Sequence, residues 1–100
     1  MENKMAKKKK TQICIITVVG EDKVGIIAKL SNAMAKADVN IVDVNQKIME
    51  DYFVMTMACD MAHASVGIEQ IQKGLNKIAR DMNLKITFQH EDIFKMMHRM

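Results

Sequence analysis

The stretch VVGEDKVGIIAKL, residues 18–30, has the layout of a loop that cradles phosphate. An apolar run leads into two glycines, Gly20 and Gly25, and an apolar-periodic segment follows. A phosphate loop needs a lysine and then a hydroxyl residue after its second glycine, to reach the phosphates and to hold magnesium. Ile26 and Ile27 stand at those positions. The stretch therefore predicts a binding loop of this shape without nucleoside triphosphate chemistry.

The side chains that bind metals or act as nucleophiles are too scattered to predict a reaction centre. Cys14 and Cys59 lie inside apolar runs, which favours two small buried side chains over metal ligands or a disulfide framework. His63, His90 and His98 lack the pair spacing of zinc ligands, and none is near a nucleophile or a pair of carboxylates in sequence. We expect no catalytic residue, no metal site, no cofactor and no enzymatic activity.

The composition predicts one small domain behind a basic tail. The chain has 100 residues, of which 49% are hydrophobic, and a formal net charge of +3. A chain of this length usually folds as one domain. The first ten residues contain five lysines and one glutamate, so the remaining ninety are nearly neutral. We expect a disordered basic tail at 1–10, a folded domain at 11–91 and a short C-terminal extension at 92–100.

Charge and hydropathy also limit the partners. A nearly neutral domain argues against a nucleic-acid interface on it, although Lys7–Lys10 have the charge to contact nucleic acid or an acidic partner. No apolar run approaches the ~20 residues that span a bilayer, and the N-terminus lacks the apolar core of a signal peptide. We therefore expect a cytoplasmic protein with no membrane contact and no nucleic-acid partner.

The spacing of the apolar residues predicts the strands and helices that hold these candidate residues. The predicted elements are a strand at 11–19, a helix at 25–37, strands at 38–50 and 52–60, a helix at 68–82 and a strand at 84–89. Asp22 and Ser65 have side chains that can cap the two helices, and Asn83 suits a left-handed stop. The segment after 90 has the pattern of one short amphipathic turn.

This order predicts an α+β, ferredoxin-like βαββαβ sandwich. Two right-handed crossovers place both helices on one face of a four-stranded antiparallel sheet. The other face carries apolar residues of the first strand, together with Val54 and Ala58, which favours self-association. The strand at 38–50 lies at an edge, and pairing with its own copy would remove that exposed edge. We expect a homodimer or a tetramer.

Several site types known on this fold lack their residues here. The RNA-binding version needs aromatic residues on both central strands, and the first strand has none. The first loop has neither the Cys-x-x-Cys of a metal chaperone nor the arginine of an acylphosphatase. A small-ligand cleft at this loop remains as the prediction.

The polar groups of this cleft suit a zwitterion such as an amino acid. Backbone amides at the start of the 25–37 helix favour an anion such as a carboxylate. Asp22 is either a helix cap or the group that takes an ammonium. Asn40 both donates and accepts hydrogen bonds, and in a dimer paired through its strand it approaches the loop of the other copy.

The sequence resembles the ACT domain family over residues 11–89. The resemblance rests on two stretches, VVGEDKVGIIAKL and ADVNIVDVNQ at 37–46. It is strongest to stand-alone ACT proteins, which look like one half of the glycine cleavage system transcriptional repressor. It implies a ligand bound between two domains. The implied contacts on one side are Gly20, Asp22, Val24, Gly25 and Ile26, and those on the other side are Asn40 and Ile41. Gly20 stands where serine-sensing relatives have histidine, so serine is not implied.

The resemblance implies a non-enzymatic regulatory domain that senses an amino acid or a related metabolite at a homodimer interface. Because the sequence shows no catalytic or DNA-binding domain, we expect its output to pass through a regulated partner protein or through assembly. The alternative is a protein-interaction module without a ligand. That module would act through its open sheet face or through the C-terminal methionines, Met96, Met97 and Met100.

Overall fold

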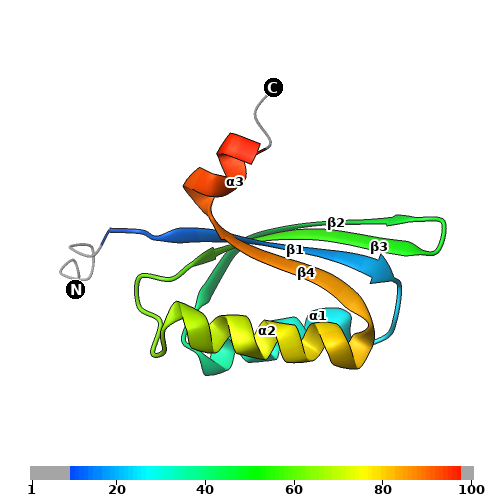
Figure 1. The fold of residues 1–100 in the computed structure, drawn as a ribbon, viewed down its shortest axis with the longest axis horizontal. Coiled ribbons are helices and arrows are strands. Elements are labelled where there is room, and N and C mark those ends of the chain that lie inside the picture. Colours follow the sequence, from blue (N-terminus) through cyan, green and yellow to red (C-terminus); the bar gives the residue numbers. More distant parts are fainter. Residues whose placement is uncertain (1–9, 98–100) are drawn as a thin grey trace.

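The computed structural model describes residues 10–97 and shows the predicted βαββαβ order, followed by one further helix (Figure 1). The predicted tail, apart from Lys10, and the last three residues lie outside the described range. The elements are β1 (Ile13–Glu21), α1 (Ile26–Lys36), β2 (Asn40–Met49), β3 (Tyr52–Asp60), α2 (Ile68–Met82), β4 (Leu84–His90) and α3 (Glu91–Met97).

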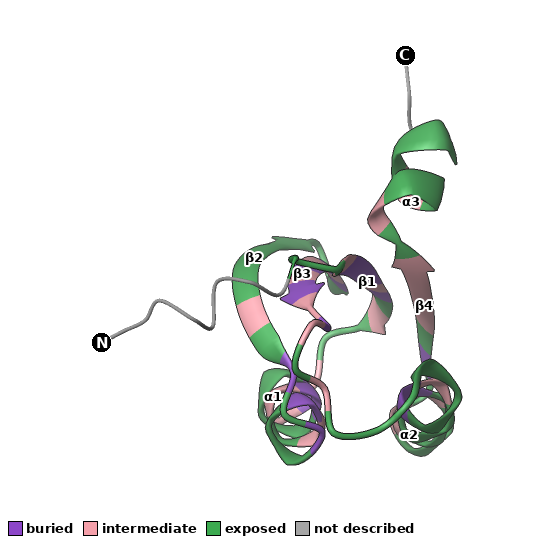
Figure 2. Cartoon of the chain, turned by 90° about the vertical axis from the view of Figure 1, so that its left-hand side faces the viewer, coloured by how far each residue is buried: buried purple, intermediate pink, exposed green. Residues whose placement is uncertain are grey.

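The four strands form one antiparallel sheet in the order β2-β3-β1-β4. Helices α1 and α2 lie side by side on one face of this sheet (Figures 1 and 2). The arrangement confirms the predicted α+β, ferredoxin-like class. None of the helices described between residues 10 and 97 is long and apolar enough to cross a membrane.

The core lies between this helix pair and the sheet. Alternate residues of each central strand point to the same face, and residues three or four apart share one face of a helix. The buried set matches these periods: Cys14, Ile16 and Val18 of β1, Phe53, Met55, Met57 and Cys59 of β3, Ile26, Leu30 and Met34 of α1, and Ile71 and Leu75 of α2. Ile27, which follows Ile26 at the start of α1, stays outside this core, with its side chain 41% exposed.

The start of α1 differs from the prediction. Strand β1 continues through Gly20 to Glu21, so the loop before α1 is shorter than expected. The N-cap is Gly25, with φ of 93°, and no side chain caps the helix. Asp22 is therefore not a helix cap; its backbone N–H donates instead to the carbonyl of Asp51 at 3.0 Å.

The ends of α2 give one correction and one confirmation. Ser65 does not cap the helix: the N-cap is Gly67, and the backbone N–H of Ser65 donates to the carbonyl of Ala37 at 2.8 Å. Asn83 ends α2 in the left-handed conformation, with φ of 55°, as predicted.

Strand β2 is an edge strand whose alternation is interrupted by a bulge between Ile41 and Asp43. Val44 and Ile48 pair opposite Met57 and Phe53, on the helix side of the sheet. The bulge inserts one residue before Asp43. As a result Ile41, and not Val42, pairs with a residue of β3 on the helix side, Cys59. All residues of β2 except Ile41 are exposed, which leaves this edge open.

Two glycines give opposite expectations for stability. A Cβ at Gly20 would lie 2.6 Å from Cδ2 of buried Leu84, so we expect Gly20→Ala to cost about 1–3 kcal/mol through overpacking. A Cβ at Gly74, inside α2, meets no atom within 4 Å, so Gly74→Ala should stabilise by about 0.5–1 kcal/mol. Urea unfolding measures both changes. Equal stability of Gly20→Ala and the unchanged chain would contradict this close contact.

Candidate functional site

A hollow of about 410 Å³ lies between the β1–α1 loop and the β2–β3 hairpin. One wall is formed by residues 22–28, which run from the loop into the first turn of α1. The other wall is formed by Gln46 and Ile48 of β2 and Phe53 of β3. The hollow therefore contains four of the predicted contacts: Asp22, Val24, Gly25 and Ile26.

The loop is fastened to the rest of the chain on two sides. The backbone N–H of Asp22 is bonded to the β2–β3 turn through Asp51, as described above. The Nζ of Lys23 donates to the carbonyl of Met82, near the end of α2. Directly after these anchors Val24 is 99% exposed, and the Ile26 side chain, 1% exposed, fixes the start of α1 in the core.

The first turn of α1 gives this hollow its electrostatic character. Its opening amides have no intrahelical acceptor, and no side chain among the described residues caps them. The first turn also contains no acidic residue. An uncapped helix start carries a partial positive charge that favours an anion such as a carboxylate. The exposed carboxylate of Asp22 at the same hollow supplies a partner for a cation.

The other predicted contacts, Asn40 and Ile41, lie far from this hollow. Asn40 pairs with Asp60, which pairs with Ile13 at the start of β1. The loop follows the opposite end of β1, eight residues later, so about 27 Å of strand separates the two ends. A single chain therefore cannot bring Asn40 and the loop together.

The remaining predicted contact, Gly20, lies inside β1 between Phe53 and Leu84 and is not among the residues that line the hollow. Sequence reasoning missed Gln46, Ile48 and Phe53 as lining residues. One signal was available for Gln46. It is a polar residue at the same parity as Val44 and Ile48, on the apolar side of a strand.

The two cysteines face each other inside the core, where Cys14 of β1 pairs with Cys59 of β3. Burial raises the pKa of both thiols, and for Cys59 burial together with the neighbouring Cys14 raises the pKa to about 11. Such thiols stay protonated at neutral pH, so they lack the thiolate that nucleophiles and metal ligands need. Within residues 10–97, no group of three or more His, Cys, Asp or Glu side chains is placed to hold a metal ion.

Comparison with known proteins decides the family. A family model described as "ACT domain" matches residues 12–89, nearly the whole described fold. The chain belongs to the ACT domain family. A UPF0237 protein of Methanococcus maripaludis is 45% identical over 85 residues, which cover 85% of this chain and 94% of that protein.

Solved structures agree with this assignment. An ACT domain protein from Streptococcus pneumoniae has a TM-score of 0.72 at 30% identity and covers 86% of this chain and 97% of its own. A protein described as a glycine cleavage system transcriptional repressor has a TM-score of 0.70 at 22% identity. That match covers 80% of this chain and 46% of the repressor, and it shows the fold alone. This chain is thus a single ACT domain, of a family of regulatory domains that commonly bind small molecules and dimerise.

Proposed function

We propose that this ACT domain senses an amino acid, or a metabolite with the same pair of charges, at a seam between two copies paired through β2. One observation carries the proposal. The hollow beside the loop and the residues Asn40 and Ile41 lie at opposite ends of the sheet, so the two predicted halves can meet only between antiparallel copies.

The charges along β2 favour one register for this pairing. Asp43 and Lys47 pair with Ala58 and Val54 of β3, so both point to the same face of the sheet. If Asn45 lies on the two-fold axis, Asp43 stands opposite the partner's Lys47 and Lys47 opposite the partner's Asp43. No other in-line register of two antiparallel copies pairs these two charges. Opposite charges at directly facing positions stabilise antiparallel strands.

The same register completes the site. Because the bulge adds one residue between Ile41 and Asp43, this register places Ile41 of one copy opposite Ile48 of the other. It places Asn40 opposite Met49, two residues before Asp51, whose carbonyl accepts the N–H of Asp22. Asn40 then lies at the end of the sheet where the loop begins, and Ile41 lies on the helix side of the sheet, beside Ile48 of the hollow. The combined groups suit a zwitterion: amides of α1 for a carboxylate, Asp22 for an ammonium, and Ile48 for an apolar side chain.

A thermal-shift screen of the whole chain against the twenty amino acids, followed by calorimetry, tests this function. A ligand of the folded state at a hundred times its Kd adds about 2.7 kcal/mol to stability. The shift should disappear in Asp22→Ala and in Asn40→Ala. It should remain in Asn76→Ala, a control asparagine exposed on α2. A folded dimer that no compound stabilises would contradict the sensor and favour the ligand-free interaction module.

Mixing the two inactive variants tests whether the site is shared. In a mixed dimer of Asp22→Ala and Asn40→Ala chains, one of the two sites has both residues intact. We therefore expect binding to return at about a quarter of all sites after subunit exchange in a symmetric dimer. A site built within one chain predicts no recovery at all.

Gly25→Val tests the loop itself. A Cβ there meets no atom within 4 Å, so crowding plays no part, but the positive φ of 93° strains any residue with a Cβ. The strain is about 1–3 kcal/mol, and relaxing it should move the loop and weaken binding about tenfold or more. Gly67→Val is the matched control, because its φ is −80° and its surroundings are open. Calorimetry that gives equal affinities for both variants would contradict a role of the loop.

A further inference from the structure

Helix α3 stands on the face of the sheet that α1 and α2 leave open, at the β4 edge (Figure 2). It contacts β1 and β4. Ile15, which points to this open face, is only 8% exposed, whereas Val19, farther along β1 on the same face, is 36% exposed. One end of the open face is therefore covered and the other is bare.

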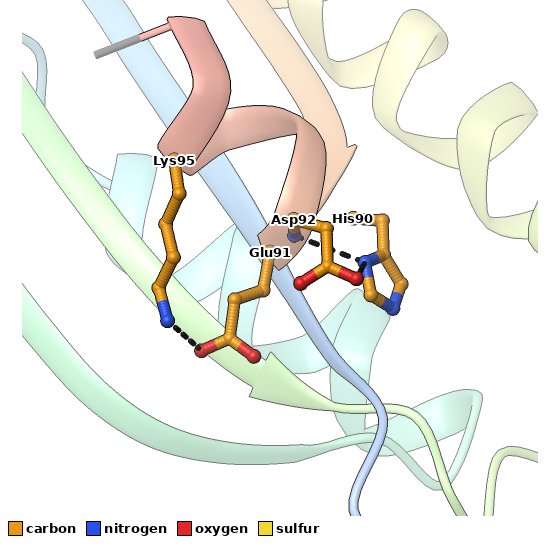
Figure 3. A network of polar contacts seen from close by, with 4 residues as sticks. All are labelled: His90, Glu91, Asp92 and Lys95. Atoms are coloured by element: carbon orange, nitrogen blue, oxygen red, sulfur yellow. Dashed lines mark hydrogen bonds and ion pairs between the residues drawn. The ribbon is translucent and has the colours of Figure 1, made fainter. Parts of the chain in front are cut away.

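Contacts near both of its ends tie α3 to β4, and Figure 3 shows the polar groups at its start. The backbone N–H of Asp92 donates to Nδ1 of His90 at 3.0 Å, and Lys95 pairs with Glu91 at 3.5 Å. The Nε2 of Gln89 donates to the sulfur of Met97 at 3.0 Å, which ties the last turn back to β4. Helix α3 is thus held beside the sheet at both of its ends.

Two hollows lie along the open face next to α3, and Val19 lines both of them. The first, of about 380 Å³, reaches from Met97 across Thr17 to Lys85. The second, of about 600 Å³, is lined by Val19, Met49, Glu50, Tyr52 and Val54. Together they form a trough that runs from α3 to the β2–β3 turn, with mostly apolar side chains in its second half.

We infer that this trough holds α3 of a second copy in a face-to-face, two-fold pair. The same face of each chain offers both parts of the contact. It has a bare trough, and α3 beside it exposes Ile93, Met96 and Met97, at 51%, 73% and 65%. An interface that uses one patch of both copies is the commonest way in which identical chains pair.

Length and charge support this occupant. The seven residues of α3 are about 10 Å long, and the bare part of β1, from Thr17 to Glu21, is about 13 Å long. The first turn of α3 is acidic, with Glu91 and Asp92, and its last turn carries Lys95. Lys85 lies beside Val19 on the β4 side of the trough, and Glu50 lies at its β2–β3 end, so the acidic first turn and Lys95 of an inserted helix each have an opposite charge to meet.

The bare part of the open face is small. Its four strands, spaced about 4.8 Å apart and bare over about 13 Å, offer roughly 200 Å² per copy. The exposed side of α3 adds to the contact on both copies, so we expect a pair of the size of a weak interface, which forms in a concentration-dependent way. This pairing leaves the β2 edge free, so it is independent of the seam proposed for the ligand, and the two together build a tetramer.

Light scattering on the Ile93→Glu/Met96→Glu chain tests the face-to-face pair. The mass of the assembly should fall by half. Ile68→Glu is the control, because Ile68 is 56% exposed on α2, on the opposite side of the sheet, and this change should leave the mass unchanged. An unchanged mass in the double variant would overturn the proposal.

Cross-linking between copies gives a second readout that does not depend on loss of assembly. Chains with Met96→Cys are mixed with chains with Tyr52→Cys and treated with a short bis-maleimide; the native thiols are buried and do not compete. We expect a covalent product of two chains that contains both variants, also when Lys47→Asp weakens the β2 seam. No product in this mixture, or an equal yield from Ile68→Cys with Tyr52→Cys, would show that α3 does not occupy the trough.

Discussion

Lys47→Asp is expected to halve the mass of the assembly at protein concentrations just above the dissociation constant of the β2 pair. In the proposed register the new carboxylate faces the partner's Asp43, and the two-fold axis repeats this repulsion. A facing pair of exposed charges is worth about 0.2–1 kcal/mol, so turning two attractions into two repulsions costs roughly 2 kcal/mol. That cost corresponds to an about 30-fold higher dissociation constant. Analytical ultracentrifugation over a dilution series measures it.

The matched control is a double variant that exchanges the two charges of the facing pair. Asp43→Lys combined with Lys47→Asp again pairs opposite charges, so its dissociation constant should return to that of the unchanged chain. Raising the salt concentration should reduce the difference between the single and double variants, because exposed charges are screened. A single variant that pairs as tightly as the unchanged chain would contradict the register about Asn45.

The second large effect is expected at alkaline pH. Between pH 9 and 11 the free energy of unfolding should fall by about 2 kcal/mol because of Cys59 alone. This thiol is fully buried, and burial raises its pKa from 9.0 to about 11. Below pH 9 both the folded and the unfolded state hold the proton, so the contribution is complete. As the pH rises from 9 to 11, the unfolded state releases its proton first, and stability falls.

Urea unfolding at pH 8, 9, 10 and 11 measures this loss. Cys59→Ala is the control: it lowers stability at every pH by leaving a cavity, but it removes the part of the slope that comes from this thiol. If the two chains lose stability in parallel above pH 9, the thiol does not have a raised pKa in the folded state.

Burial periods made much of this fold predictable from sequence. The alternation of Phe53, Met55, Met57 and Cys59 and the three-and-four spacing along α2 arise from one-sided burial, which the local sequence records. Asn83 was predictable for a related reason, because its side chain tolerates the left-handed conformation that ends the helix.

The helix starts were not predictable, because their partners lie far away in the chain. The residues chosen as caps, Asp22 and Ser65, donate their backbone N–H groups to Asp51 and Ala37 instead. The bulge after Ile41 likewise depends on how β2 meets β3. A local pattern contains none of these long-range bonds.

The candidate site also combines residues that the local sequence predicts with residues that only the fold brings together. The loop residues were found from glycine spacing and from the family resemblance, both of which are local. Gln46, Ile48 and Phe53 join the loop only through the hairpin register and the crossover of α1, so their role required the three-dimensional arrangement. The sequence predicted one short turn after residue 90, whereas α3 has seven residues. The hydrogen bond from the N–H of Asp92 to Nδ1 of His90, at the start of α3, could not be predicted from the apolar pattern.

The separation of Asn40 from the loop has a consequence for physiology. Because one chain holds only half of each proposed site, the ligand must tighten subunit pairing by the same factor by which pairing tightens ligand binding. The half-saturation point therefore depends on how much of the protein a cell makes. A cell that raises expression responds to a lower metabolite level, without any change in the sequence of the sensor.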